Sequence, residues 1–314
     1  MPCSARLSWR GEGLSFNLGA ETSRSILDYR DSSPGVPPFW GPYQDIIEPV
    51  GKEERRGIYA NATWTVGDFA LSPGLRYDYS STSQEFVSPS LGATWKVRED
   101  TLLRATVTRG FSAPYLATFI FGNNPDLKPE KIWSYQAGVE TNYLPMVYLK
   151  ATVFHQQVED VWYLVEVPWR NQGRTRWDGV DLEVKSVEFK GFAATANFSY
   201  ILEDSVIDQG GSPLDLNDDK LYGGNLIIDY RHRQYNITAQ LAGHYVHWNT
   251  YSLGEFPRDD TWLWDFTVGK TFVMPHLQPE VFASVHNLTN ASQFWDFEYA
   301  NPNRWVEAGV KVNY

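Results

Sequence analysis

Residues 110–130 read GFSAPYLATFIFGNNPDLKPE, and this stretch separates two segments in which apolar and polar residues alternate. Two of its X-Pro steps lie close together, at 124–125 and 128–129, and the residue before a proline is restricted to extended conformations. Glu130 then leads into an alternating segment that begins near Ile132. The stretch therefore predicts a rigid loop that returns the chain to a sheet.

The same alternation recurs through nearly the whole chain, and a period of two residues is the pattern of a strand with two different faces. We expect about fifteen strands on this pattern. The clearest alternating segments are 58–66, 103–108, 147–153, 180–185, 192–200 and 306–314. The predicted fold class is all-β and antiparallel.

The connections predicted between these strands are of two kinds. Short turns are expected near 11–13, 67–68, 98–100, 144–146, 188–191, 231–234 and 274–279. Longer loops are expected at 23–54, 80–85, 111–130, 159–176, 203–219, 249–260 and 291–303. Short turns at one end and long loops at the other are typical of a transmembrane β-barrel, with the turns on the periplasmic side.

Aromatic residues make up 15% of the chain, and they support the barrel interpretation. In a bilayer, outward-facing rings gather at the two interfaces with water. At the loop end, the alternation predicts outward rings at Tyr77, Tyr79, Phe198, Tyr200, Tyr245, Trp262 and Trp264. At the turn end it predicts Trp64, Trp95, Phe192, Tyr235 and Tyr314. A soluble sandwich or propeller would not sort its rings in this way.

Composition excludes several other classes. The net charge of -11 argues against a nucleic-acid partner, because phosphate binding requires clustered Lys and Arg. The single cysteine, Cys3, excludes an internal disulfide framework. No apolar run is long enough for a spanning helix. The first 20 residues do not read as a signal peptide, so we expect Met1 to be an internal start or the edge of an incomplete reading frame.

Two motifs in order, together with the final strand, resemble the C-terminal part of the β-barrel of TonB-dependent outer-membrane receptors, from about Arg56 onwards. The residues that carry the resemblance are Gly110, Phe111, Pro114, Asn124, Pro125, Leu127, Pro129 and Glu130, then Asn287 and Leu288, and the terminal aromatic Tyr314. The resemblance implies a structural role for the first motif. It also implies that the barrel-assembly machinery recognises Tyr314.

Family members have a plug domain followed by a barrel of about 22 strands, so the resemblance implies that residues 1–314 are the C-terminal portion of such a barrel, with about 15 strands and no plug. With the first strands missing, the sheet is expected to close incompletely and to leave two open edges. The implied location is the outer membrane of a Gram-negative bacterium. The expected partners are membrane lipid, the assembly machinery and, only through the missing plug, the TonB energising complex.

The resemblance implies a receptor that imports a scarce nutrient, with a ferric siderophore first and haem, cobalamin or an oligosaccharide left open. Aromatic and Arg-rich loops suit an anionic iron chelate. The loop candidates for ligand contact are Trp40, Tyr43, Tyr115, Phe119, Phe121, Trp162, Trp169, Arg170, Arg174, Tyr251 and Arg258. The alternatives are a passive porin and a truncated remnant without function.

No catalytic, metal or cofactor site is predicted. Asp181 and Glu183 share one face, but Lys185 continues the same row, which favours a wet polar lining over an acid–base pair. His244 and His247 lie three apart on a strand and should point to opposite faces, so they could not bind one metal. The predicted lumen-facing set is Arg76, Asp78, Arg104, Lys150, Asp181, Glu183, Lys185, Asp265 and Lys311.

Overall fold

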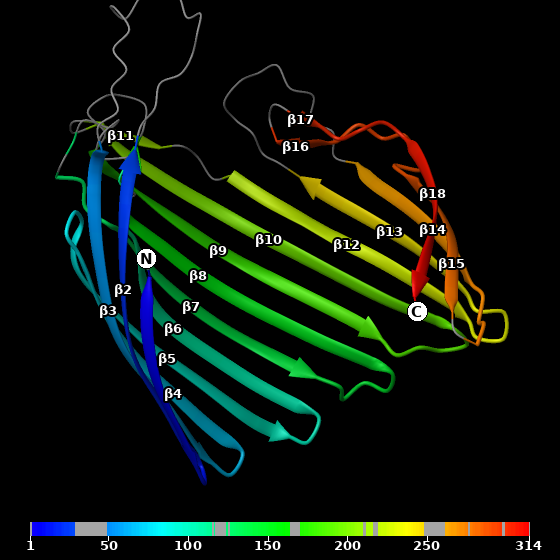
Figure 1. The fold of residues 1–314 in the computed structure, drawn as a ribbon, viewed down its shortest axis with the longest axis horizontal. Helices are drawn as coiled ribbons and strands as arrows, with labels where there is room; N and C mark the ends of the chain where they lie inside the picture. The colour runs from blue at the N-terminus through cyan, green and yellow to red at the C-terminus, as the bar shows by residue number, and fades with distance from the viewer. Residues whose placement is uncertain are drawn as a thin grey trace, which may run out of the picture.

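A computed structural model describes residues 2–28, 49–114, 116, 124, 126–163, 170–209, 212–215, 219–247, 261–275, 277–296 and 299–313. Its elements are strands, and most of them form one curved sheet (Figure 1). Among these residues, no helix is long and apolar enough to cross a membrane.

The strands follow the chain in order around the sheet. They are β1 (Cys3–Gly11), β2 (Leu14–Asp28), β3 (Pro49–Val66), β4 (Phe69–Ser80), β5 (Gln84–Arg98), β6 (Thr101–Ser112), β7 (Glu130–Thr141), β8 (Val147–Tyr163), β9 (Arg170–Ser186), β10 (Phe192–Gln209), β11 (Ser212–Asp215), β12 (Asp219–His232), β13 (Ile237–His247), β14 (Trp262–Thr271), β15 (Gln278–His286), β16 (Phe294–Asp296), β17 (Tyr299–Ala300) and β18 (Trp305–Asn313).

The main sheet contains 16 strands, and every adjacent pair in it is antiparallel. Fifteen strands form a continuous path from β1 to β18, β11 pairs with β10 beside this path, and β16 and β17 form a small separate hairpin. This confirms the all-β antiparallel fold class. In the described part of the chain, β1 pairs only with β2 and β18 only with β15, so the sheet is unclosed, as expected.

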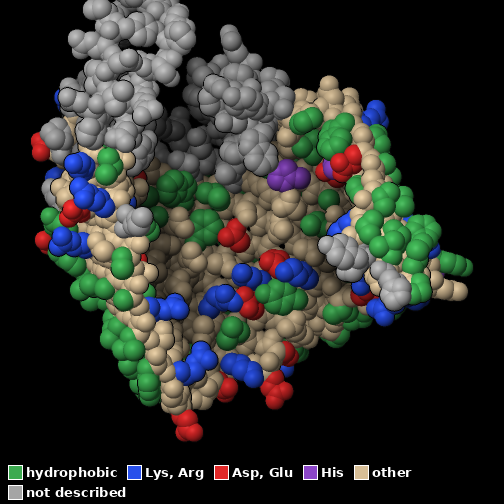
Figure 2. Space-filling model, in the orientation of Figure 1, with side chains coloured by type: hydrophobic (Ala, Val, Ile, Leu, Met, Phe, Trp, Pro, Cys, Tyr) green, Lys and Arg blue, Asp and Glu red, His purple; other side chains and the backbone are tan. Residues whose placement is uncertain are grey.

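The sheet has two chemically different faces because side chains alternate along each strand. Its hollowed face carries charged groups, as Figure 2 shows. The opposite, convex face carries rows of large apolar side chains that are exposed, including Leu103, Val153 and Leu182. Few described apolar side chains are buried; Phe86 and Leu127 are examples. Such a surface is expected where a bilayer replaces water as the solvent.

The turn end of the sheet follows the prediction closely. Tight turns lie at 12–13, 67–68, 99–100 and 190–191. Gly13 and Gly191 have positive φ, which is the backbone conformation that glycine adopts without strain. These turns set the register of the hairpins that lead into the hollowed sheet.

The loop end corrects the predicted strand limits. β2 continues to Asp28 and β3 begins at Pro49, so pairing extends into the segment predicted as loop 23–54. The connection at 80–85 is a three-residue turn, and β10 continues to Gln209. The reason is that hairpin hydrogen bonds continue beyond the width of a bilayer without needing an apolar row, so alternating hydrophobicity underestimates strand length.

Rings on the convex face form a ladder at the loop end of β10 and β12–β14. Centroid distances are 6.5 Å for Tyr200–Tyr222, 6.1 Å for Tyr222–Tyr245 and 5.5 Å for Tyr245–Trp262. Trp262 stacks on Trp264 at 5.2 Å. This confirms the predicted outward positions of Tyr200, Tyr245, Trp262 and Trp264, and Tyr222 joins them without having been predicted.

Gly243 shows how this ladder is packed. A Cβ atom at this position would lie 2.5 Å from Cζ3 of Trp264, the residue directly opposite on β14. The indole therefore covers the glycine backbone, and only glycine leaves room for it.

Candidate functional site

The loop that carries the first motif packs into the sheet at its loop end. Pro114 and Leu127 are among the most deeply buried residues described. Leu116 lies against β3, where its Cδ1 would be 3.0 Å from a Cβ built on Gly51. Phe111 contacts Phe86 of β5, with ring centroids 4.6 Å apart. The motif loop thus contacts β3, a strand far earlier in the sequence.

Asn171 of β9 fixes the second half of this loop. Its Oδ1 accepts from the Lys128 N–H at 2.9 Å, and its Nδ2 donates to the Lys128 carbonyl at 2.9 Å and to the Asp160 carbonyl at 2.7 Å. The Trp162 indole also donates to the Lys128 carbonyl, at 2.8 Å. Glu130 accepts from the Trp162 N–H at 3.1 Å. These bonds hold the predicted rigid re-entry in place.

Removing the Asn171 side chain is expected to loosen this re-entry. Asn171→Ala leaves the Lys128 N–H and the Asp160 carbonyl without these partners, at an expected cost of about 1–2 kcal/mol of unfolding free energy. The measurement is urea unfolding in detergent micelles, with trypsin cleavage after Lys131 as a local readout, because the Lys128–Pro129 bond resists trypsin. Gln136→Ala, an exposed change on β7, is the matched control. Equal stability and equal cleavage of the two variants would refute the role of Asn171.

The second motif forms a comparable anchor between β15 and β18. Asn287 is 5% exposed, has a φ of 50° and donates from Nδ2 to the carbonyls of Ala291 and Pro302 at 2.8 and 3.0 Å. Its Oδ1 accepts from the Ala291 N–H at 2.8 Å. The Leu288 N–H donates to the Trp264 carbonyl at 2.6 Å. One buried amide therefore organises the loop.

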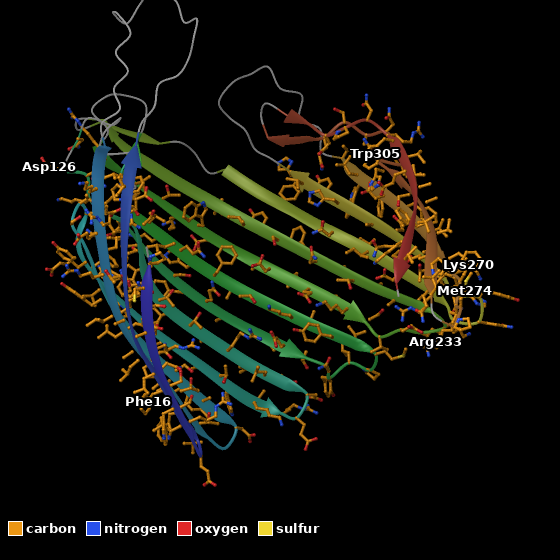
Figure 3. All side chains as sticks on the ribbon, viewed as in Figure 1. Phe16, Asp126, Arg233, Lys270, Met274 and Trp305 are labelled. Atoms are coloured by element: carbon orange, nitrogen blue, oxygen red, sulfur yellow. The ribbon has the colours of Figure 1, made fainter. Side chains whose placement is uncertain are left out.

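A hollow of about 320 Å³ lies beside this anchor on the concave face, and its lining includes Asp265, His286 and Trp305 among apolar and amide side chains. Asp265 accepts from the Asn287 N–H at 2.8 Å and contacts His286 at 3.2 Å. His286 also contacts Glu307 at 3.4 Å and stacks on Trp305 at 4.0 Å. Figure 3 shows Trp305 at the loop end, where β18 begins.

A second hollow of about 470 Å³ lies between β1–β4 and the motif loop. Arg76 at its wall bonds Asp78 and Glu21. Next to it, Glu53 is only 3% exposed and accepts from Arg55 at 2.8 Å and from Ser80 at 2.8 Å. A buried carboxylate of this kind requires such partners, so this wall is held by polar bonds rather than by apolar packing.

Elsewhere the concave face is lined by ion pairs. Glu140 of β7 contacts both Arg104 and Lys150, from β6 and β8. On β9, Lys185 pairs with Glu183. The register places the predicted lumen-facing residues on this face, and Asp265 also lines the hollow beside Asn287. Half-exposed pairs of both signs suit a wetted wall, and Asp181 bonds Ser199 rather than forming an acid–base pair with Glu183.

The predicted ligand contacts are only partly described by the structure. Trp162, Arg170 and Arg174 lie at the loop ends of β8 and β9, where Arg170 and Arg174 are exposed. The indole N–H of Trp162 is already bonded, so a ligand could use only its ring face. The remaining loop candidates, Trp40, Tyr43, Tyr115, Phe119, Phe121, Trp169, Tyr251 and Arg258, lie outside the described residues, as do Pro125 and Tyr314.

The two histidines of β13 point to opposite faces, as predicted. His244 bonds Asn225 at 2.6 Å and lines the hollow near Asn287, whereas His247 stacks on Tyr222 at 4.3 Å in the outer ladder. Asn171 and Glu53 were not predicted from the sequence as residues of the site. The residues next to a polar residue in an alternating strand do not indicate which distant loop its side chain will bind.

Comparisons with known proteins agree with this architecture. A family model described as "TonB dependent receptor-like, beta-barrel" matches residues 4–288. The vitamin B12 transporter BtuB of Vibrio vulnificus is 26% identical over 319 residues, which cover 96% of this chain and 48% of BtuB.

Solved structures show the same fold at lower identity. A G324V mutant of the ferric enterobactin receptor PfeA of Pseudomonas aeruginosa has a TM-score of 0.75 at 14% identity, covering 99% of this chain and 53% of PfeA. The siderophore receptor PirA of the same organism has a TM-score of 0.74 at 19% identity, covering 100% of this chain and 55% of PirA. The chain therefore spans about half the length of these relatives.

Proposed function

Because the chain belongs to the TonB-dependent receptor β-barrel family, we propose that it is the C-terminal part of an outer-membrane transporter that imports a scarce nutrient. The family match over residues 4–288 is the observation that carries this proposal. The loops at the end of the sheet capture the ligand, and energy supplied from the inner membrane admits it past a plug. The proposed location is the outer membrane of a Gram-negative cell, where the convex face of the sheet contacts lipid.

We propose a metal chelate as the ligand class, with a ferric siderophore as the first candidate. Arg170 and Arg174 are exposed at the loop end, where the register pairs Arg170 with Tyr163 and Trp162 with Asn171. Cations and rings together suit an anionic, aromatic chelate. Cobalamin is the second candidate, because the 26% identical relative BtuB is a vitamin B12 transporter.

Uptake by cells that carry the native gene tests both the transport and the ligand. We expect accumulation of a labelled ferric catecholate to depend on the gene and on the energising complex, and to fall at least about five-fold in an Arg170→Ala, Arg174→Ala double variant. Labelled cyanocobalamin is assayed in parallel. The control variant is Gln157→Ala, on β8.

The outcomes separate the alternatives. Gene-dependent uptake of cyanocobalamin but not of the ferric catecholate would identify cobalamin, and not a ferric siderophore, as the ligand. Uptake that continues without the energising complex would favour a passive porin and contradict the transport mechanism. Unchanged uptake in the double variant would remove the two arginines from the ligand site.

A further inference from the structure

A basic and aromatic collar lies at the turn end of the sheet. Its members are Phe189, Lys190, Arg233, Tyr235, Lys270 and Phe272. They come from three turns, β9–β10, β12–β13 and β14–β15, that are far apart in the sequence. Figure 3 shows Arg233, Lys270 and Met274 together at one corner of the molecule.

Direct contacts join the three turns into one surface. Arg233 pairs with Glu188 at 2.7 Å, which links the second turn to the first. Lys270 donates to the Tyr235 carbonyl, which links the third turn to the second. The collar is therefore a continuous surface.

Each lysine of the collar lies over a ring. The ammonium of Lys190 is 5.3 Å from the centroid of Phe189, and that of Lys270 is 5.7 Å from the centroid of Phe272. These rings remain 57% and 44% exposed. A cation beside an exposed ring is the pattern that favours the interface between lipid headgroups and acyl chains.

The collar continues the apolar convex face rather than the polar concave face. Phe189 bridges to Phe192, and Phe192 contacts Tyr230 at 4.6 Å in the convex row. At the far side, Met274 is 49% exposed next to Phe272. The rings therefore extend a surface that faces lipid in the proposed location.

The sign of the charge is opposite to that of the chain as a whole. The chain has a net charge of -11, yet the collar has three cations, Lys190, Arg233 and Lys270, beside the carboxylate of Glu188. Basic groups at a membrane surface attract anionic headgroups. The positive charge of the collar and its continuity with the convex face thus both favour an anionic lipid as the ligand.

We propose that the turn-end collar binds anionic phospholipid of the facing leaflet, with the three cations on the headgroup phosphates and the rings at the acyl boundary. This uses the membrane placement of the proposed function but not its ligand. Failure of nutrient uptake would therefore leave it intact, and failure of lipid binding would leave the uptake proposal intact.

The test measures lipid preference of the full chain in zwitterionic detergent micelles. Phosphatidylglycerol or phosphatidylcholine is titrated in, and the apparent Kd is taken from the shift in Tm and from lipid retained in native mass spectrometry. Wild type should bind phosphatidylglycerol more tightly, and a Lys190→Gln, Arg233→Gln, Lys270→Gln variant should lose at least about ten-fold in affinity. High salt should remove the preference.

A matched control removes the same charge at the opposite end of the convex face. It is the triple variant Arg24→Gln, Lys52→Gln, Arg56→Gln, whose positions the register places near the loops of β2 and β3. This variant should keep the phosphatidylglycerol preference. If the collar variant does not fold, Lys190→Gln alone and the salt dependence of the wild type decide the question.

Three results would overturn the proposal. They are equal binding of the two lipids by wild type, equal loss in the two triple variants, and glycerol 3-phosphate producing the same shift as phosphatidylglycerol. The last result would identify a site for free phosphate rather than for lipid.

Discussion

Added to preformed phospholipid bilayers, the 314-residue chain is expected not to insert as a stable monomer. Within the described residues, the outer edge of β1 and the outer edge of β18 have no partner strand. Each strand has 9 residues, and lipid cannot bond the free N–H and C=O groups, at several kcal/mol each. The two edges together would cost on the order of tens of kcal/mol.

Gel mobility and protease protection measure this prediction. A closed barrel resists denaturation in cold detergent and runs faster than its boiled form, and we expect no such shift for this chain after bilayer reconstitution. A detergent-resistant monomer with both edge strands protected from protease would contradict the open-edge structure. The control is a complete outer-membrane barrel reconstituted in the same lipid, which must show the shift.

The second large effect is expected from Asn287→Ala. The change removes two donated bonds and one accepted bond from a side chain that is 5% exposed. It also places alanine at a φ of 50°. We expect a loss of about 3 kcal/mol in unfolding free energy, measured by urea unfolding in detergent micelles.

Two further variants separate the causes of this loss. Asn287→Gly keeps the backbone conformation accessible, so any remaining loss reports the missing bonds. Ser292→Ala changes an exposed residue of the same loop and should have no effect beyond about 0.5 kcal/mol. If Asn287→Ala behaves like Ser292→Ala, the buried amide does not organise the loop.

The order of the strands could be predicted because apolar and polar residues alternate along each strand and so distinguish the two faces of the sheet. In the segment 147–153, apolar Val, Leu and Ala alternate with Tyr, Lys and Thr, and β8 begins at Val147 as predicted. Such alternation persists only where one face meets an apolar solvent. The strand number and the antiparallel order follow from it.

The candidate site was less predictable because its bonds join positions that are distant in sequence. Asn171 bonds a backbone 43 residues earlier, and Glu53 bonds Ser80 across 27 residues. Neither residue differs locally from any other polar residue of a strand. For the loop ligand contacts, the structure describes Trp162, Arg170 and Arg174, and the rest stay predictions.

The parity of the strand path restricts what could complete the sheet. The path has fifteen strands, so β1 and β18 both run from the loop end to the turn end. Joining them directly would create a parallel seam, and a second copy of the chain would create two, whereas transmembrane barrels of this class pair antiparallel throughout. Only an odd number of additional strands completes the sheet, because only then is every neighbour antiparallel and the total even.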